Sequence, residues 1–95
     1  MSKNSVAFRL YVAGESVNSR QAVANLEALC SECLPGRHTI EVLDVFQCPE
    51  RAMEDGVFLT PTLVILSMDP PRRIVGTLSD RGVVTRMLGM DLASL

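Results

Sequence analysis

Apolar positions along the chain form two kinds of pattern, continuous runs and stripes at helical spacing. Val6–Ala13 is apolar at nearly every position, and Leu63–Leu66 is apolar throughout. Continuous apolar runs of this length are typical of strands that are covered on both faces of a sheet. We therefore predict that these two segments are the central strands.

Between these runs, one broad stripe of apolar residues recurs at helical spacing. Its members are Ala22, Val23, Leu26, Leu29, Cys30, Cys33 and Leu34. Asn18 or Ser19 can cap this helix at its start, and Gln21 lies three residues after Asn18, as in a capping box. Pro35-Gly36 ends the helix.

The second half of the chain gives shorter signals. His38–Phe46 has the pattern of a strand whose first half alternates between polar and apolar residues. Proline at a first helical position predicts a short helix over Pro49–Asp55. A four-residue strand over Arg73–Gly76 follows, and Ser79 caps a last helix over about Asp80–Leu88.

The resulting order, βαβαββα, is that of the thioredoxin core, an α/β fold with a mixed four-stranded sheet. The first two strands and the helix between them form a parallel, right-handed unit, and the last two strands form a hairpin. Ferredoxin-like folds combine similar elements, so the order alone leaves that alternative open. The length of 95 residues predicts one domain over 1–95, with a loose polar segment at 1–5.

Charge and composition narrow the class of partner. The net charge is −2, and the longest run of basic residues is the pair Arg72-Arg73. Nucleic acid and anionic membranes are therefore poor partners. Three cysteines are an odd number, and because their spacing is not that of a disulfide framework, they fit a reducing cytoplasm.

Cys30-Ser31-Glu32-Cys33 is a CxxC motif, the pattern that thiol-disulfide enzymes use. In such enzymes the motif lies at the start of the first helix, where the helix dipole stabilises a thiolate. Here it falls in the last turn of the predicted helix, and the redox position, Gly14–Asn18, has no cysteine. We therefore expect Cys30 and Cys33 to pack in the core, and the chain not to be an enzyme.

A zinc site made of Cys30, Cys33, His38 and Cys48 is a further alternative. Geometry opposes it, because His38 and Cys48 lie at opposite ends of the second strand and ten extended residues span roughly 30 Å. Zinc ligands must all lie about 2.0–2.3 Å from one ion. We expect neither a metal nor a cofactor, since the single histidine and the scattered glycines supply no hydrolytic triad and no phosphate loop.

Thr60-Pro61-Thr62 leads into the third strand. A cis bond before proline can turn the chain sharply into a central strand, at a cost of about 0.5–1 kcal/mol. We predict a cis peptide at Thr60-Pro61, in a structural turn that can also shape a partner surface.

Several short blocks together resemble the KaiB family in order and spacing. They are Tyr11–Gly14, Asn18-Ser19, Asn25-Leu26, Leu43–Val45 with Pro49, Thr60–Leu63, Pro71–Gly76 and Leu78–Asp80. The resemblance implies a non-enzymatic regulator that binds a KaiC-type ring ATPase and modulates its phosphorylation cycle in a circadian or related timing system. KaiA and a KaiC-associated histidine kinase are the further partners that it implies.

The resemblance also implies two folds. One is the thioredoxin-like form that binds KaiC, and the other is a βαββααβ packing in a tetramer. We accordingly expect a homo-oligomer, a dimer or a tetramer. Arg72, Arg73, Gly89 and Asp91 are the residues that the resemblance associates with fold switching or oligomer formation.

Thr39 and Glu41 are the candidate partner-binding residues, because the second strand lies at the sheet edge and its first half has an exposed face. Glu41 occupies a position where clock members of the family can carry a basic residue. A rewired homologue in a stress response is therefore an open alternative to a clock role. A self-assembling protein without a dedicated partner is another, and the sequence does not separate it from a regulator.

Overall fold

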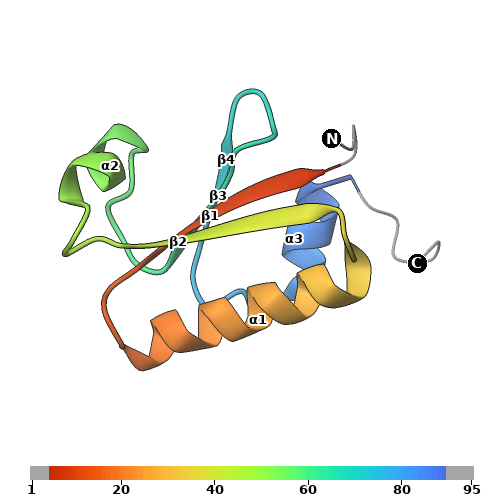
Figure 1. The fold of residues 1–95 in the computed structure, drawn as a ribbon, viewed down its shortest axis with the longest axis horizontal. Helices are drawn as coiled ribbons and strands as arrows, with labels where there is room; N and C mark the ends of the chain where they lie inside the picture. Colours follow the sequence, from red (N-terminus) through yellow and green to blue (C-terminus); the bar gives the residue numbers. More distant parts are fainter. Residues whose placement is uncertain (1–4, 90–95) are drawn as a thin grey trace.

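The computed structural model describes residues 5–89, so only Ser5 of the predicted loose N-terminal segment falls within it. Seven elements follow one another in the predicted order (Figure 1). They are β1 (Val6–Val12), α1 (Val17–Cys33), β2 (His38–Asp44), α2 (Pro49–Glu54), β3 (Thr62–Ile65), β4 (Arg72–Val75) and α3 (Arg81–Met87).

The four strands form one mixed sheet in the order β2-β1-β3-β4. β1 pairs in parallel with β2, with Val6 opposite His38 at the start of the register, and it pairs antiparallel with β3. β3 and β4 form the antiparallel hairpin. The prediction that the two most apolar strands are central is confirmed, as is the thioredoxin-like mixed sheet.

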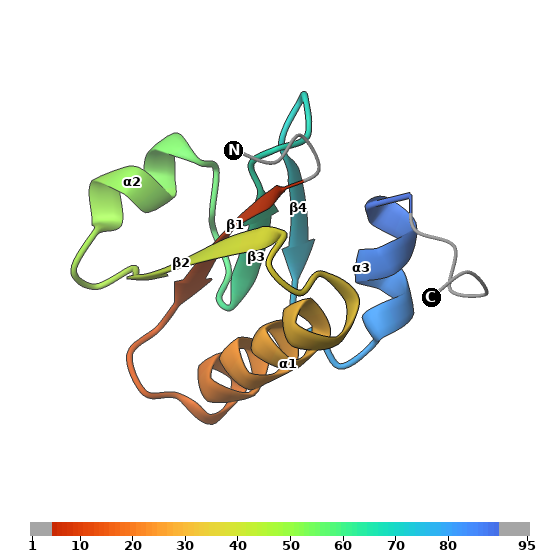
Figure 2. The same ribbon diagram turned by 45° about the vertical axis from the view of Figure 1, so that its right-hand side comes forward.

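The main core lies between one face of the sheet and the helices α1 and α3. Alternate residues of β1 point into it, among them Phe8 and Leu10, where they meet Leu26 of α1 and Val84 of α3. The opposite face carries a smaller cluster, in which Tyr11 and Val64 pack beneath α2. Figure 2 shows α2 on the other side of the sheet from α1. Both faces of β1 are thus covered, which explains its continuous apolar run.

The start of α1 differs from the prediction. The helix begins at Val17 with Ser16 as its N-cap, not Asn18 or Ser19. The Ser16 hydroxyl accepts a hydrogen bond from the Ser19 backbone N–H at 3.3 Å. Ser19 is buried, and its hydroxyl oxygen instead accepts from the Ala13 N–H at 3.0 Å.

Other boundaries shift by one or two residues. β2 ends at Asp44, whose carboxylate accepts from the Phe46 N–H at 2.9 Å and turns the chain out of the sheet. α3 is capped by Asp80 rather than Ser79, because the Asp80 carboxylate accepts from the Gly82 N–H at 3.0 Å. None of the helices in residues 5–89 is both long and apolar enough to cross a membrane.

Candidate partner-binding surface

Within residues 5–89, β2 is an edge strand that pairs only with β1, and it carries both candidate partner-binding residues. Thr39 and Glu41 are exposed. Because they lie two positions apart on one strand, their side chains share a face of the sheet, the face on which α2 also lies. Both residues thus lie at an accessible edge of the sheet.

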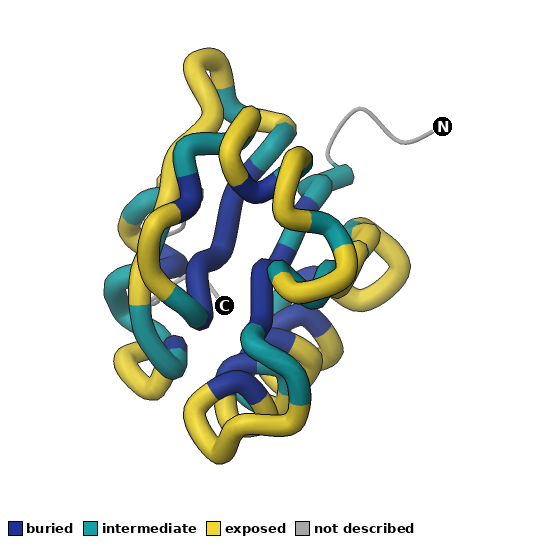
Figure 3. The backbone as a smooth tube through the Cα atoms, turned by 90° about the vertical axis from the view of Figure 1, so that its left-hand side faces the viewer, coloured by how far each residue is buried: buried dark blue, intermediate teal, exposed yellow. Residues whose placement is uncertain are grey.

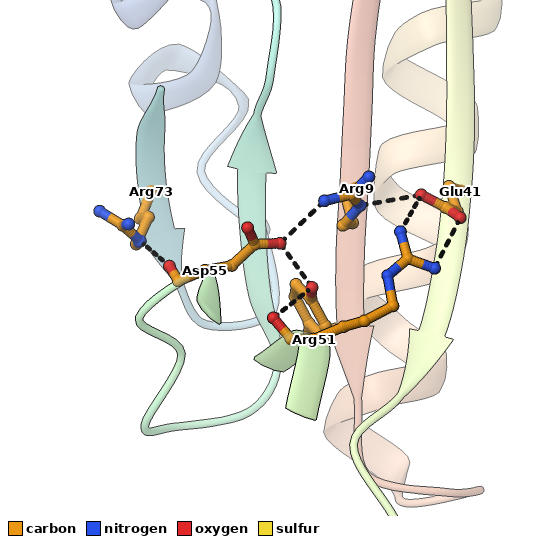
Figure 4. A network of polar contacts seen from close by, with 6 residues as sticks. Arg9, Glu41, Arg51, Asp55 and Arg73 are labelled. Carbon is orange, nitrogen blue, oxygen red and sulfur yellow. Dashed lines mark hydrogen bonds and ion pairs between the residues drawn. The ribbon is translucent and has the colours of Figure 1, made fainter. Parts of the chain in front are cut away.

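Glu41 is bound by two arginines from other elements (Figure 4). Arg9 of β1 donates from Nε to Glu41 Oε1 at 2.8 Å. Arg51 of α2 donates to both carboxylate oxygens at 3.2 Å, in a bidentate pair. Arg9 also donates from Nη1 to Asp55 Oδ2 at 2.9 Å, so it connects the end of α2 with the β2 edge.

Tyr11 of β1 also belongs to this network. Its ring is fully buried in β1, and its hydroxyl donates to the Asp55 carboxylate and lies 3.1 Å from the Arg51 carbonyl oxygen. Arg73 of β4 donates from Nε to the backbone oxygen of Asp55. Residues from β1, β2 and β4 therefore hold α2 against this face of the sheet.

The charges in the network stabilise one another. Hydrogen bonds from Arg9 and then from Arg51 lower the pKa of Glu41. Burial opposes ionisation of Asp55, but hydrogen bonds from Tyr11 and Arg9 outweigh it and lower the pKa of that carboxyl. Burial, followed by the hydrogen bond to the Asp55 carboxylate, raises the pKa of Tyr11 to about 12.

The sequence pattern indicated Glu41 as a candidate, but it did not indicate Arg9, Tyr11, Arg51 or Asp55. One signal was present: Arg9 is the only charged residue within the apolar run of a central strand. A charge in that position requires a partner when the strand is covered on both faces. The sequence offers no comparable signal for Asp55, because its approach to Arg9 depends on how α2 folds back over the sheet.

The Thr60-Pro61 peptide is cis, as predicted. Pro61 and Thr62 are buried, and the Pro61 carbonyl accepts from the Gly76 N–H at 2.9 Å, which ties the turn to the end of β4. Thr60 is half-buried and lines an open groove of about 290 Å³ beside α2. The Asp69-Pro70 peptide is also cis, which the sequence analysis did not predict.

Cys30 and Cys33 lie in the last turn of α1, at the end of the helix that the sequence predicted. Cys30 is buried, and burial followed by the neighbouring Cys33 raises its pKa to about 11. A thiol with a raised pKa is a poor nucleophile at neutral pH. Within residues 5–89, the structure gathers no three His, Cys, Asp or Glu side chains that could hold a metal ion.

Three of the four residues associated with fold switching or oligomer formation, Arg72, Arg73 and Gly89, lie within the part of the chain that the structure describes. Arg72 and Arg73 are exposed on the edge strand β4, and Arg73 joins the network through Asp55. Gly89 follows α3 with a positive φ of 73°, a backbone conformation that glycine adopts readily. Asp91 lies outside the described residues.

Solved structures with the same fold define the class of protein. The chain superimposes on the thioredoxin Deadhead of Drosophila melanogaster with a TM-score of 0.72 and 16% identity, over 92% of this chain and 81% of that one. It matches the N-terminal domain of Synechococcus elongatus SasA with a TM-score of 0.72 and 15% identity, again over 92% and 81%. The chain thus has a thioredoxin-like fold, with its CxxC at the far end of α1.

Sequence relatives identify the family. The KaiB domain model matches residues 9–90. A circadian clock protein, KaiB3 of Synechocystis sp., is 39% identical over 92 residues, or 97% of this chain and 88% of the relative. A circadian clock oscillator protein KaiB of Microcystis aeruginosa is 39% identical over 90 residues, or 95% and 85%. The chain belongs to the KaiB family.

Proposed function

We propose that this chain is a non-enzymatic regulator that binds a KaiC-type ring ATPase and modulates its phosphorylation cycle in a circadian or related timing system. The observation that carries the proposal is the family match over residues 9–90, together with relatives named as circadian clock proteins. In this proposal the chain acts in the cytoplasm, and KaiA or a KaiC-associated histidine kinase competes or cooperates at its surface. The chain also forms a dimer or tetramer of its own.

The proposed contact is the β2 edge at Thr39 and Glu41, with the turn at Thr60–Thr62 shaping the adjacent surface. Support comes from the free edge of β2 and the exposure of both side chains. Because Glu41 is engaged by Arg9 and Arg51, it contributes in two ways: through its own charge and by holding α2 in place. Exposed edges are also kept polar to prevent aggregation, so the proposal requires a binding test.

The test is a titration of the purified chain against the host's KaiC-type ATPase at low salt, with variants that separate these two contributions. Thr39→Lys changes the edge and leaves the network in place. Arg51→Gln removes the bidentate link between α2 and Glu41 without altering β2, and Glu41→Lys removes that link and also changes the edge. We expect Thr39→Lys and Glu41→Lys each to weaken binding by about tenfold or more.

The outcome with Arg51→Gln assigns the role of Glu41. If Arg51→Gln weakens binding as much as Glu41→Lys, Glu41 acts by positioning α2; if it has no effect, the Glu41 charge faces the partner. Circular dichroism of each variant checks that the fold is intact. Unchanged binding by folded Thr39→Lys and Glu41→Lys would remove the β2 edge from the proposal, and no binding by the wild type would remove the ATPase.

A further inference from the structure

Four large apolar side chains remain in solvent around α2. Of the three phenylalanines in the chain, Phe8 is in the core, but Phe58 is 88% exposed and Phe46 is 76% exposed. Met53 and Leu59 are exposed as well. Single exposed apolar residues are ordinary, whereas a cluster of them marks an interaction surface.

Three of these four side chains gather around one groove. Phe46 comes from the turn after β2, Met53 from α2 and Phe58 from the segment before β3, and all three line the groove of about 290 Å³. Ala52 and Val57, which are buried, form part of its lining too. We call this surface, over residues 44–60, the α2 pole. Figure 3 views the molecule from this side and shows exposed chain around a buried interior.

The α2 pole is acidic. Residues 44–60 contain four acids, Asp44, Glu50, Glu54 and Asp55, and one base, Arg51. Because Arg9 of β1 and Arg73 of β4 lie against Asp55, the acidic character of this surface comes from Asp44, Glu50 and Glu54. The one base is directed to Glu41 on β2, which leaves Glu50 and Glu54 exposed on α2 beside Met53. A second copy of the chain, meeting this surface with its own, would place like charges opposite one another.

The groove is also held in shape. The Val57 N–H donates to the Ala52 carbonyl at 2.8 Å, and the Phe46 N–H donates to Asp44. Tyr11 and Arg73 bind the backbone at the end of α2. A surface fixed in this way loses little conformational entropy when a partner binds.

We propose that the α2 pole docks a protein segment in which apolar or aromatic side chains are flanked by lysine or arginine. The apolar side chains occupy the groove between Phe46, Met53 and Phe58, while the basic side chains face Glu50 and Glu54. This surface is distinct from the β2 edge of the proposed function. The proposal therefore stands whether or not the ring ATPase is the partner.

Two short synthetic peptides test it. Both carry the same leucine and phenylalanine side chains, which are flanked by lysines in one peptide and by glutamates in the other. We expect the lysine peptide to shift the amide resonances of residues 44–60 in the ¹⁵N-labelled chain, and the glutamate peptide to bind at least about tenfold more weakly at low salt. Equal binding of the two peptides, or shifts confined to another surface, would overturn the proposal.

Variants at exposed positions keep the test independent of folding. Phe58→Ser should weaken the lysine peptide by about tenfold, whereas Val17→Ser, an exposed apolar residue that does not line the groove, should leave its affinity unchanged. Glu50→Lys with Glu54→Lys should reverse the preference between the peptides. A dimer that Phe58→Ser abolishes would instead make a second copy the occupant, against the proposal.

Discussion

Glu41 occupies an exposed position on an edge strand, yet both of its carboxylate oxygens accept hydrogen bonds from arginines on other elements. Alternation of polar and apolar residues along β2 was enough to predict that this side chain points outwards. The pattern could not predict Arg9 and Arg51 as its partners, because they approach from β1 and α2 only once the sheet and α2 are assembled. For a single side chain, the sequence thus predicts whether it is exposed better than it predicts which residues it contacts.

For the cysteines, in contrast, the position in the sequence was sufficient to predict their place in the fold. The place of Cys30 and Cys33 at the end of α1 followed from the helical stripe alone and is confirmed. The environment of Cys30 follows from its place on the buried side of that stripe, and burial raises its pKa to about 11.

Tyr11 offers a test of the network from its buried end. Tyr11→Phe keeps the ring but removes the donor to Asp55, and we expect it to lower the free energy of unfolding by about 1–2 kcal/mol. The raised pKa gives a second signature. The folded state retains the Tyr11 proton above the ordinary pKa of 10.0, so this contribution to stability is complete below that pH and is lost as the pH rises towards about 12.

Urea unfolding at neutral and alkaline pH measures both effects. Stability of the wild type should decline more steeply than that of Tyr11→Phe once the pH exceeds 10.0. Parallel pH profiles for the two proteins would show that folding does not raise the pKa of Tyr11.

At the scale of elements, the apolar pattern together with proline and capping residues predicted every helix and strand of residues 5–89 in the right order, but not their ends. β1 and β3 are covered on both faces of the sheet. Most of their residues are therefore apolar, and the sequence shows them as continuous apolar runs. The ends are set by single hydrogen bonds from side chains, such as Asp44 to the Phe46 N–H and Asp80 to the Gly82 N–H. Several neighbouring residues could make such bonds, so spacing alone did not choose among them.

The N-terminus of α1 makes this difference measurable. Ser16→Ala removes the hydroxyl that accepts from the Ser19 N–H, and we expect it to cost about 0.5–2 kcal/mol of stability. Asn18→Ala is the matched control, since Asn18 is exposed inside the helix and is not its N-cap. Thermal unfolding of the two variants compares them, and a larger loss for Asn18→Ala than for Ser16→Ala would contradict Ser16 as the cap.

At the level of the whole molecule, the topology brings together residues that lie in separate segments of the sequence. Phe46, Met53 and Phe58 lie in three separate segments of the sequence, and each stands next to another apolar residue, so the linear pattern did not mark them as a group. They meet at one groove only because α2 folds back across the sheet and the cis turn returns the chain to β3. The candidate edge at Thr39 could be predicted from strand order, whereas the α2 pole required the structure.

The secondary-structure elements before residue 48 are longer than most of those after it. Before residue 48 stand a long capped helix and two seven-residue strands. After it come a six-residue helix, two four-residue strands and a seven-residue helix that contains Gly82 and Val84. Short elements, among them a helix that contains poor helix formers, allow two packings to lie within a few kcal/mol.

Hydrogen exchange and the oligomeric state both test whether the chain after residue 48 is less stable than the chain before it. A gap of about 3 kcal/mol leaves a minor packing near 1% populated, which is enough for faster exchange. We expect amides of α2, β4 and α3 to exchange faster than those of α1 and β1, while the fully buried strand β3 stays protected.

Light scattering after size-exclusion chromatography should also show a dimer or tetramer at micromolar concentration. Met87 and Leu88 pack against the core, so an interface built from them requires α3 to move and should change exchange in α3 as concentration rises. The matched variant is Phe58→Ser, which we expect to leave the oligomer intact, because the interface expected here lies at α3 and not at the α2 pole. A strict monomer with equal protection in α1, α2 and α3 would show that the chain has one packing only.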